Sequence, residues 1–573
     1  MAGGGPTGPP PNLPDSLSNL AAPISGHLGL PPWPDDRPLR AWQLKAIEAV
    51  EAHRDSSFLA SATPAAGKTT FGLKVAHQML SSGQVSRVVV IGPTTHICRQ
   101  WAADAARYGI ELEPNRPNSD GPEPSDMHGV AVTYQTIAAG PGGHASSARK
   151  PTLVIADEPH HMGDQAAWGT RAQKAFGHAT FRLLLSGTPF RSDNSAIPWV
   201  AYDDDGVSRA DYVYGYAEAL VDRVCRPITF QPYDGEMEWE SEGQRRNAGF
   251  DIVLPQAETA RRLRTALAAD GDWMGEVLTD ADTKLSEVRS LGHANAGGLV
   301  IASDQEHARA IAIRLHGICG EEPEIVMSDE PDASARIARF SDSDRRWLVS
   351  VLMVSEGVDI PRLRVGVYAT AARTELFFRQ VVGRFIRTTP APKRQMSYLL
   401  LPADGRLKQL AAAIEKERRH ALDLSPGLEE ELEDDEELAE RRPAGEAFRV
   451  LSSTDAQMDE AILSQTTMQL FATEDLVDPD APAPKPVRKP VPVPRPPEGV
   501  APPAPPKKES AYQARERLRA ARRVLVADVS RRTNESHQQV NGRINRMTGV
   551  QSVSKATIQQ LEKGNVLLER DLK

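Results

Sequence analysis

The stretch from Ser61 to Thr70 combines a flexible backbone with one positive charge and several hydroxyl groups. It reads Ser-Ala-Thr-Pro-Ala-Ala-Gly-Lys-Thr-Thr, after a short apolar run and before a helix-forming run. Backbone N–H groups of such a loop can surround phosphates, while Lys68 binds the β- and γ-phosphates and the Thr69 hydroxyl ligates Mg²⁺. Ala62 replaces the usual first glycine, so an ordinary strand-to-helix turn is the alternative. The residues expected to contact the nucleotide are Thr63, Pro64, Ala65, Ala66, Gly67, Lys68, Thr69 and Thr70.

Two adjacent carboxylates, Asp157 and Glu158, directly follow the apolar run at 153–156. The carboxyl end of a strand in an open parallel sheet faces the ligand crevice, so Asp157 could hold Mg²⁺ through water. Glu158 could orient or deprotonate a water that attacks a phosphate. An acidic turn after a strand is the alternative. His160 and His161 are adjacent and follow the glutamate, which does not match the i, i+4 histidine pair of zinc proteases.

A third polar group lies far along the chain, at 378–387, and reads Phe-Arg-Gln-Val-Val-Gly-Arg-Phe-Ile-Arg. On a helix, Arg384 and Arg387 are one turn apart on the same face, so both could reach one γ-phosphate. Guanidinium groups suit the charge on a transferring phosphoryl group, and Gln380 belongs to the same element. A solvated helix face is the alternative.

Gln43 precedes Lys68 by twenty-five residues, in a stretch with helical apolar spacing. A glutamine amide donates and accepts hydrogen bonds at once, as recognition of the adenine edge requires. The alternative is a polar residue on an exposed helix face. The position upstream of the phosphate loop favours a nucleotide contact.

These residues must be positioned by alternating strands and helices. Apolar runs too short for helices, such as 87–92 and 181–185, alternate with helical stretches such as 96–108, which predicts an α/β fold. Cysteines occur only at 98, 225 and 319, too far apart for a disulfide framework or a cysteine zinc site. With no membrane-length apolar run and no secretory signal, we expect a cytoplasmic protein without a membrane partner.

The motifs occur in a familiar order. The phosphate loop, Asp-Glu-Pro-His at 157–160, Ser-Gly-Thr-Pro at 186–189, Ser-Glu-Gly-Val-Asp-Ile-Pro at 355–361 and Gln-x-x-Gly-Arg-x-x-Arg at 380–387 resemble motifs I, II, III, V and VI of superfamily 2 helicases. The similarity is to the DExH group, nearest the type III restriction motors and excision-repair helicases. The resemblance implies two tandem RecA-like parallel-sheet lobes, ATP and Mg²⁺ as cofactors, and nucleotide contacts from Gly357 and Asp359.

Composition and the resemblance together divide the chain into seven parts. We expect a disordered leader at 1–38, an ATP-binding lobe at 39–195, an inter-lobe or accessory segment at 196–296, a second lobe at 297–405, a helical and acidic segment at 406–475, a proline-rich linker at 476–510 and a basic helical module at 511–573. The inter-lobe segment contains an aromatic cluster that could stack unpaired bases or pack the core of an accessory subdomain, namely Trp199, Tyr202, Tyr212, Tyr214 and Tyr216.

The resemblance implies an ATP-dependent nucleic-acid helicase or translocase, with DNA favoured over RNA as partner. The alternative is an ATP-switched assembly or remodelling factor that separates no strands and is regulated by protein partners through 403–573. The module at 511–573 carries thirteen Lys and Arg against six Asp and Glu. Its three expected helices suit a helix-turn-helix-like nucleic-acid module or, alternatively, a protein-docking module.

Overall fold

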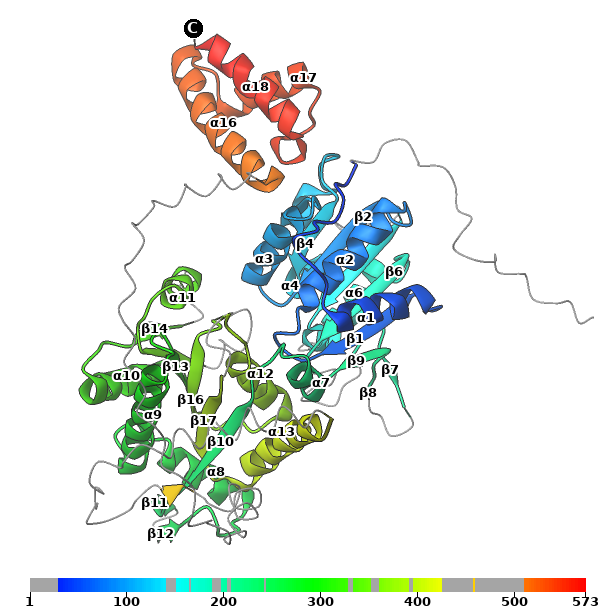
Figure 1. The fold of residues 1–573 in the computed structure, drawn as a ribbon. Coiled ribbons are helices and arrows are strands. Elements are labelled where there is room, and N and C mark those ends of the chain that lie inside the picture. The colour runs from blue at the N-terminus through cyan, green and yellow to red at the C-terminus, as the bar shows by residue number, and fades with distance from the viewer. Residues whose placement is uncertain are drawn as a thin grey trace, which may run out of the picture.

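The computed structural model describes residues 29–140, 151–163, 166–187, 197–203, 208–241, 244–327, 333–351, 360–390, 395–424, 457–458 and 510–572. Within these ranges the chain forms two seven-stranded sheets with helices and a separate group of C-terminal helices (Figure 1). We call the part built on the first sheet lobe 1, the part built on the second sheet lobe 2, and the C-terminal helices the module.

Lobe 1 is a wholly parallel sheet in the order β3-β4-β2-β5-β6-β1-β9. Its strands are β1 (Ser57–Ala62), β2 (Arg87–Gly92), β3 (Leu112–Pro114), β4 (Gly129–Thr133), β5 (Thr152–Asp157), β6 (Phe181–Ser186) and β9 (Tyr212–Tyr214). Its helices are α1 (Ala41–Ala52), α2 (Lys68–Ser81), α3 (Thr95–Ala106), α4 (Tyr134–Ala139) and α6 (Ala166–Phe176). A short antiparallel pair, β7 (Ala201–Tyr202) and β8 (Ser208–Arg209), lies apart from the sheet.

Successive side chains of the lobe 1 strands enter two different hydrophobic clusters. Val88 and Val90 of β2 belong to one cluster, and Val89 and Ile91 belong to the other. The two clusters therefore lie on opposite faces of the sheet. Burial on both faces explains why these strands read as continuous apolar runs rather than as alternating patterns.

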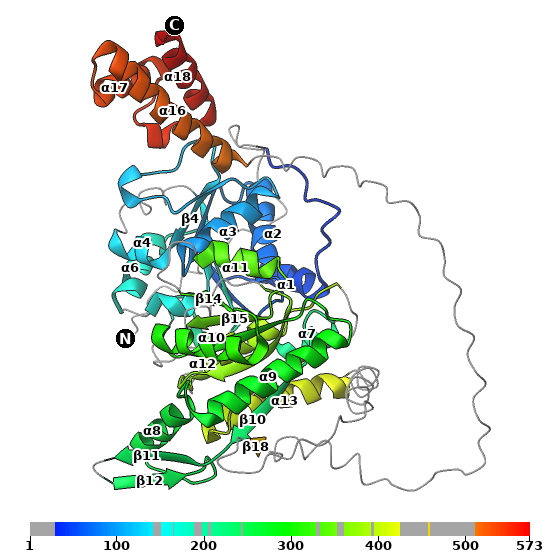
Figure 2. The same ribbon diagram turned by 90° about the vertical axis from the view of Figure 1, so that its left-hand side faces the viewer.

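Lobe 2 has the order β14-β15-β13-β16-β17-β10-β18, parallel except for the last pair. The strands are β10 (Ile228–Asp234), β13 (Gly297–Ala302), β14 (Glu324–Val326), β15 (Trp347–Val351), β16 (Leu363–Ala369), β17 (Ser397–Pro402) and β18 (Gln457–Met458). The helices are α8 (Gln256–Ala266), α9 (Asp272–Ser290), α10 (Gln305–Cys319), α11 (Ala333–Ser341), α12 (Glu375–Phe385) and α13 (Gly405–Leu424). A hairpin of β11 (Met237–Ser241) and β12 (Gln244–Ala248) extends from lobe 2 beside α8 (Figure 2).

The expected two-lobe α/β fold is confirmed, and the segment 196–296 takes part in both sheets. β9 pairs with β1 in lobe 1, and β10 pairs with β17 in lobe 2, so the segment 196–296 supplies a strand to each sheet. Helix α7 (Tyr216–Val221) connects the two strands and packs against α13. Such short strands are fixed by partners distant in sequence, which a local pattern does not reveal.

The last ten residues of the expected leader, 29–38, are not disordered but pack against lobe 1. Trp33 stacks on Tyr108 with ring centroids 4.0 Å apart, and the Lys74 ammonium lies 4.8 Å from the Trp33 ring centroid. His77 Nε2 lies 2.8 Å from the carbonyl oxygen of Pro31. One aromatic ring supplies enough contact area to order a segment whose composition predicts disorder. Residues 1–28 lie outside the described residues.

Two tyrosines of the inter-lobe aromatic group pack the core instead of offering a base-stacking surface. Tyr214 is 3% exposed and stacks on Trp42 with centroids 5.0 Å apart. Tyr216 is 4% exposed, and its hydroxyl donates to the carbonyl oxygen of Arg226 at 3.1 Å. These contacts support the alternative interpretation for both residues.

The module consists of α16 (Ala511–Thr533), α17 (His537–Thr548) and α18 (Ile558–Asp571), as the sequence predicts. Ser536 caps the start of α17, and Asn534 ends α16 in the left-handed conformation with φ +61°. The acidic run at 429–440 and the proline-rich stretch at 478–508 lie outside the described residues. None of the helices that the structure describes has both the length and the apolar character needed to cross a membrane.

Candidate nucleotide site between the lobes

The phosphate loop connects β1 to α2, as the sequence predicts. Gly67 precedes α2 with φ +92°, and Ala65 also has a positive φ of +67°. Ala62, which stands where the pattern has its first glycine, is not among the residues with positive φ. The loop adopts a left-handed backbone at positions 65 and 67 and not at position 62. Replacement of the first glycine by Ala62 therefore adds no backbone strain at that position.

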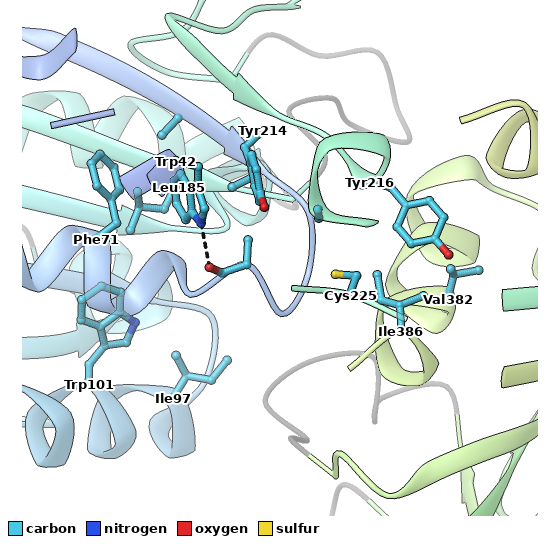
Figure 3. Packing of buried hydrophobic residues seen from close by; sticks show 14 of the residues in the cluster. Trp42, Phe71, Ile97, Trp101, Leu185, Tyr214, Tyr216, Cys225, Val382 and Ile386 are labelled. Atoms are coloured by element: carbon cyan, nitrogen blue, oxygen red, sulfur yellow. Dashed lines mark hydrogen bonds between the residues drawn. The ribbon is translucent and has the colours of Figure 1, made fainter. Parts of the chain in front are cut away.

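The carbonyl groups of this loop are held by the start of α1. Arg40 Nη1 donates to the carbonyl oxygens of Ala65 and Ala66 at 2.9 and 2.7 Å, and Trp42 Nε1 donates to Ala66 O at 3.0 Å (Figure 3). With the carbonyls bound on the α1 side, the loop is fixed as a preformed phosphate cradle. Arg40 also lines the site cavity. The sequence analysis missed both residues as site residues because their partners lie more than twenty residues away.

Gln43 is buried, and both the oxygen and the nitrogen of its side-chain amide already make hydrogen bonds within the protein. It is 2% exposed, its Oε1 accepts the N–H of Arg40 at 2.8 Å, and its Nε2 donates to Gly67 O at 2.9 Å. The expected exposed-face alternative is therefore wrong. A role in adenine recognition stays a prediction, while the structure gives Gln43 a positioning contact to the phosphate loop.

Glu158 and Lys68 form an ion pair at the centre of the site. The Lys68 ammonium lies 3.0 Å from Glu158 Oε1 and donates to Ala62 O at 3.3 Å. Glu158 Oε2 accepts hydrogen bonds from Ser186 Oγ at 3.1 Å and from the Gly187 N–H at 3.3 Å. The end of β6 thus contacts the carboxylate at the end of β5, which links the third expected motif to the second.

The conformation and charge state of Glu158 are both unusual. Its φ is +52°, a left-handed value that non-glycine residues seldom adopt, and its N–H donates to Leu185 O at 2.8 Å. Burial alone would raise the pKa of this carboxyl, but the charges of Lys68 and His160 and the hydrogen bonds from Lys68 and Gly187 outweigh it and lower the pKa to about 2. Glu158 is therefore ionised at neutral pH.

Asp157 is oriented by two aromatic side chains of lobe 1. Trp101 Nε1 donates to Asp157 Oδ2 at 2.8 Å, and the Tyr134 hydroxyl donates to the Asp157 carbonyl at 2.8 Å. Asp157 and Thr69 line one cavity, so the donor set fits a Mg²⁺ ion held by one carboxylate and one hydroxyl. Within the described parts of the chain, no group of three or more His, Cys, Asp and Glu side chains could hold a metal.

Lobe 2 contributes its arginines differently from the expected helix face. α12 ends at Phe385, so Arg384 lies in its last turn, whereas Arg387 lies beyond the helix in an isolated antiparallel bridge with Cys225. The Arg226 N–H donates to Ile386 O at 2.8 Å and extends this pairing. The two β-branched residues and the proline at 388–390 oppose continuation of the helix.

Both arginines nevertheless reach the same cavity as the phosphate loop. The cavity has a volume of about 400 Å³ and lies between the lobes. The expected site residues that line it are Pro64, Ala65, Gly67, Lys68, Thr69, Asp157, Glu158, Gln380, Arg384 and Arg387. α3 adds Gln100, Trp101 and Asp104, which the sequence analysis did not select.

Other expected site residues lie elsewhere. Ala66 is fully buried, Thr63 lines a separate cavity of about 630 Å³ on the α7 side, and Thr70 lines neither cavity. Gly357 and Asp359 lie outside the described residues, as do Thr188 and Pro189 of the third motif.

The lobes touch directly beside the site. A Cβ atom added to Gly383 of α12 would come within 2.5 Å of the Pro64 ring. Figure 3 shows Cys225, Val382 and Ile386 facing the phosphate loop from the lobe 2 side. Glycine at 383 is therefore required for this close approach of the arginine-bearing helix to the phosphate loop.

Residues 36–191 match the family model described as type III restriction enzyme, res subunit. An uncharacterized protein of Mycobacterium tuberculosis is 48% identical over 393 residues, which are 67% of this chain and 64% of that protein. An uncharacterized protein of Mycobacterium leprae is 45% identical over 395 residues, 68% of this chain and 66% of that protein. The chain spans just under two thirds of the length of these curated relatives.

Two solved structures align with much of this chain at low sequence identity and with TM-scores below 0.5. A fragment described as the HsdR subunit of a type I restriction enzyme from Vibrio vulnificus has a TM-score of 0.44 and 18% identity, and the alignment covers 65% of each chain. Dbp5 of S. cerevisiae, bound to RNA and ADP BeF3, has a TM-score of 0.42 and 13% identity over 69% of this chain and 93% of that chain. The stretch 36–191, which contains the phosphate loop and the carboxylate pair that line the cavity, is therefore similar to the res subunit of type III restriction enzymes.

Proposed function

We propose that this protein is an ATP-dependent nucleic-acid motor, a helicase or translocase that hydrolyses ATP between its two lobes. One observation carries the proposal: Lys68 and Glu158 of lobe 1 and Arg384 and Arg387 of lobe 2 line a single cavity. A triphosphate needs a cradle, a water-orienting group and positive charge at the γ-phosphate. The cavity contains a residue suited to each of these tasks.

Glu158 suits orientation or deprotonation of the attacking water. In the structure the Lys68 ammonium lowers the pKa of this carboxyl, and this charge leaves Glu158 when Lys68 moves to the phosphates. Its two hydrogen bonds from Ser186 and Gly187 fix the direction of the carboxylate. Glu158 then aligns the attacking water, while Lys68 exchanges its contact with Glu158 for the β- and γ-phosphates.

The two arginines supply the charge that a phosphoryl group needs as it transfers. Arg384 and Arg387 line the side of the cavity formed by lobe 2, so both would approach the γ-phosphate from there. A Mg²⁺ ion held by Thr69 and Asp157 supplies further neutralisation of phosphate charge when bound. Because the contributing residues come from both lobes, binding of the triphosphate favours lobe closure, and hydrolysis releases it.

The family resemblance and the polar helix starts of lobe 1 support a nucleic-acid partner. Thr94 caps α3 and Thr133 caps α4. The resemblance to superfamily 2 helicases implies that the segments 93–95 and 133–136, which contain these caps, line the nucleic-acid track or support it. Superfamily 2 motors contact mainly the sugar-phosphate backbone. Such contacts distinguish DNA from RNA only through the local geometry around the 2′-hydroxyl group. We propose DNA as the partner, in the cytoplasm, on the restriction-motor branch of the family.

Steady-state ATP hydrolysis in Mg²⁺ tests the proposal. Lys68→Ala and Glu158→Gln should each reduce turnover to background while the far-ultraviolet circular dichroism stays unchanged. Lys284→Ala is the matched control, because Lys284 lies in α9 of lobe 2, where it pairs with Glu287 and contacts the Tyr398 ring, and does not line the nucleotide cavity. Full activity of the Lys68→Ala variant would contradict the proposal.

A further inference from the structure

The module has a hydrophobic core of its own. Val526, Val529, Val540, Ile544 and Leu568 form one buried cluster, and Leu518, Ala556 and Leu561 form another. α18 packs against both α16 and α17, and Gly549 ends α17 with φ +70° before the turn to α18. α17 and α18, joined by the connection 549–557 and packed on α16, form an arrangement similar to a helix-turn-helix unit with a longer connection. In helix-turn-helix proteins the start of the second helix meets the major groove of DNA.

In this structure that end of the module faces lobe 1 (Figures 1 and 2). The N–H of Ile558, the first residue of α18, donates to Asp126 Oδ2 at 3.0 Å. The carbonyl oxygen of Ser554, just before α18, accepts hydrogen bonds from Arg116 of lobe 1 at 3.1 Å and from Arg519 at 2.9 Å. The surface that a helix-turn-helix unit presents to DNA is therefore covered.

Three carboxylates of lobe 1 make the contact, and we call Glu111, Glu113 and Asp126 the acidic strip. Arg515, fully buried, pairs with Asp126 at 2.6 Å, and Arg519 pairs with Glu113 at 3.2 Å. The N–H of Ala511, at the start of α16, donates to Glu111 Oε2 at 3.2 Å. Each carboxylate thus meets cationic or N–H donors of the kind that bind phosphate oxygens.

Ion pairs and hydrogen bonds hold the module against lobe 1. Among the residues that the structure describes, no hydrophobic cluster combines side chains of the module with side chains of lobe 1. Contacts between charged groups weaken with salt and yield to a competing polyanion, unlike a shared apolar core. The long sequence between α13 and α16, proline-rich at 478–508, can keep a released module attached to the motor.

We propose that the module is a duplex-DNA-binding element whose binding face is covered by the acidic strip, so that DNA phosphates and the three carboxylates compete for Arg515, Arg519 and the start of α18. DNA binding then requires release of the module from lobe 1. The inference adds a second DNA contact to the proposed motor and does not depend on ATP hydrolysis.

Fluorescence anisotropy with a labelled DNA duplex, the full chain and no ATP tests the proposal. Glu113→Gln with Asp126→Asn should bind the duplex about 10-fold more tightly than wild type, since two charge-assisted contacts no longer oppose binding. Asp270→Asn with Glu322→Gln is the matched control, because it removes the same charge from exposed positions of lobe 2. Equal affinity of the two double variants would overturn the proposal.

Two further experiments distinguish a covered DNA-binding face from a general effect of charge on DNA affinity. Arg519→Gln should weaken duplex binding more than Arg523→Gln, which neutralises an exposed arginine of the same helix. Amide exchange in residues 111–126 of the full chain should become faster when the duplex saturates the protein, because the module leaves. Unchanged exchange there, or an equal effect of heparin and duplex DNA on exchange, would overturn competition by a DNA-binding face. Because all arms omit ATP, an inactive motor would not alter them.

Discussion

The two lobes have the same strand topology but different chemistry at their strand ends. In the sheet orders, β10 takes the place of β1, and β13, β14, β15, β16 and β17 take the places of β2, β3, β4, β5 and β6. In lobe 1, β1 leads to the phosphate loop and β5 ends at the Asp157-Glu158 pair. The strand ends that we propose to bind phosphate in lobe 1 therefore have topological counterparts in lobe 2.

Lobe 2 uses the equivalent strand ends for structure. After β10, Asp234 Oδ1 accepts the N–H groups of Gly235 and Phe250 and so closes the loop that carries the β11–β12 hairpin. After β16, Thr370 accepts the N–H of Ala372, and no carboxylate follows before α12. Lobe 2 instead contributes arginines from the end of α12. The comparison shows that the topology provides a rigid frame, while a few residues at strand ends decide which lobe holds the nucleotide.

The largest expected effect comes from removing the part of the site that lobe 2 supplies. Arg384→Ala and Arg387→Ala should each lower the turnover number for ATP by roughly 10³-fold or more, because each removes charge from the transferring phosphoryl group. Arg379→Ala is the control on the same helix, since Arg379 pairs with Glu375 and Glu417 away from the nucleotide cavity. Equal turnover of all three variants would show that lobe 2 takes no part in the chemistry.

The next effect concerns how closely the lobes approach. Gly383→Ala should lower the turnover number for ATP by about 100-fold. The new Cβ atom clashes with Pro64, so α12 must shift and Arg384 moves away from the position proposed for the γ-phosphate. ATP binding to lobe 1 should change little, so equilibrium nucleotide binding and turnover must be measured together. Gly405→Ala serves as control, because a Cβ at that position meets nothing within 4 Å. Wild-type turnover of Gly383→Ala would mean that the lobes do not need this contact.

Arg40→Ala tests the support of the phosphate loop. The change removes two hydrogen bonds to the loop carbonyls and should raise the KM for ATP several-fold and destabilise lobe 1 by about 1–3 kcal/mol. Lys45→Ala, at an exposed position of the same helix, should leave both quantities unchanged. Chemical unfolding and ATP titrations provide the measurements, and indistinguishable variants would contradict a supporting role.

The smallest effect is on stability at low pH. Since folding lowers the pKa of Glu158 from 4.5 to about 2, its ionised form stabilises the fold above pH 4.5, and this contribution disappears as the pH falls toward 2. Wild type should exceed Glu158→Gln by at most about 3 kcal/mol at pH 7, with a smaller difference at pH 3. Denaturant unfolding at the two pH values measures this, and a difference that does not depend on pH would show that the carboxylate is not held in its ionised form.

Local patterns predicted what lies within one strand–loop–helix unit. The phosphate loop, the carboxylate pair and the start of α12 each depend on neighbours within about ten residues, and apolar runs mark the buried strands before them. The two-lobe fold followed from the order of these units and from the family resemblance. The roles proposed for Lys68, Glu158 and Arg384 could therefore be predicted from the sequence before the distances between these residues were known.

Partners distant in sequence could not be predicted in the same way. Arg387 pairs with Cys225 beyond the end of α12, and β9 pairs with β1 in lobe 1, where Tyr214 stacks on Trp42. The contacts of Arg40 with the phosphate loop and of Arg515 with Asp126 join residues 25 to 389 positions apart. Such pairings are decided by tertiary packing, which outweighs the local preference of a short segment.

The most direct test of the account is steady-state ATP hydrolysis by wild type and Glu158→Gln, without polymer and with single-stranded DNA, duplex DNA or RNA, at two salt concentrations. The account predicts strong stimulation of wild type by DNA that weakens at higher salt, and no turnover by the variant under any condition. Hydrolysis that no nucleic acid stimulates, or turnover that survives in Glu158→Gln, would contradict a nucleic-acid motor driven from the cavity between the lobes.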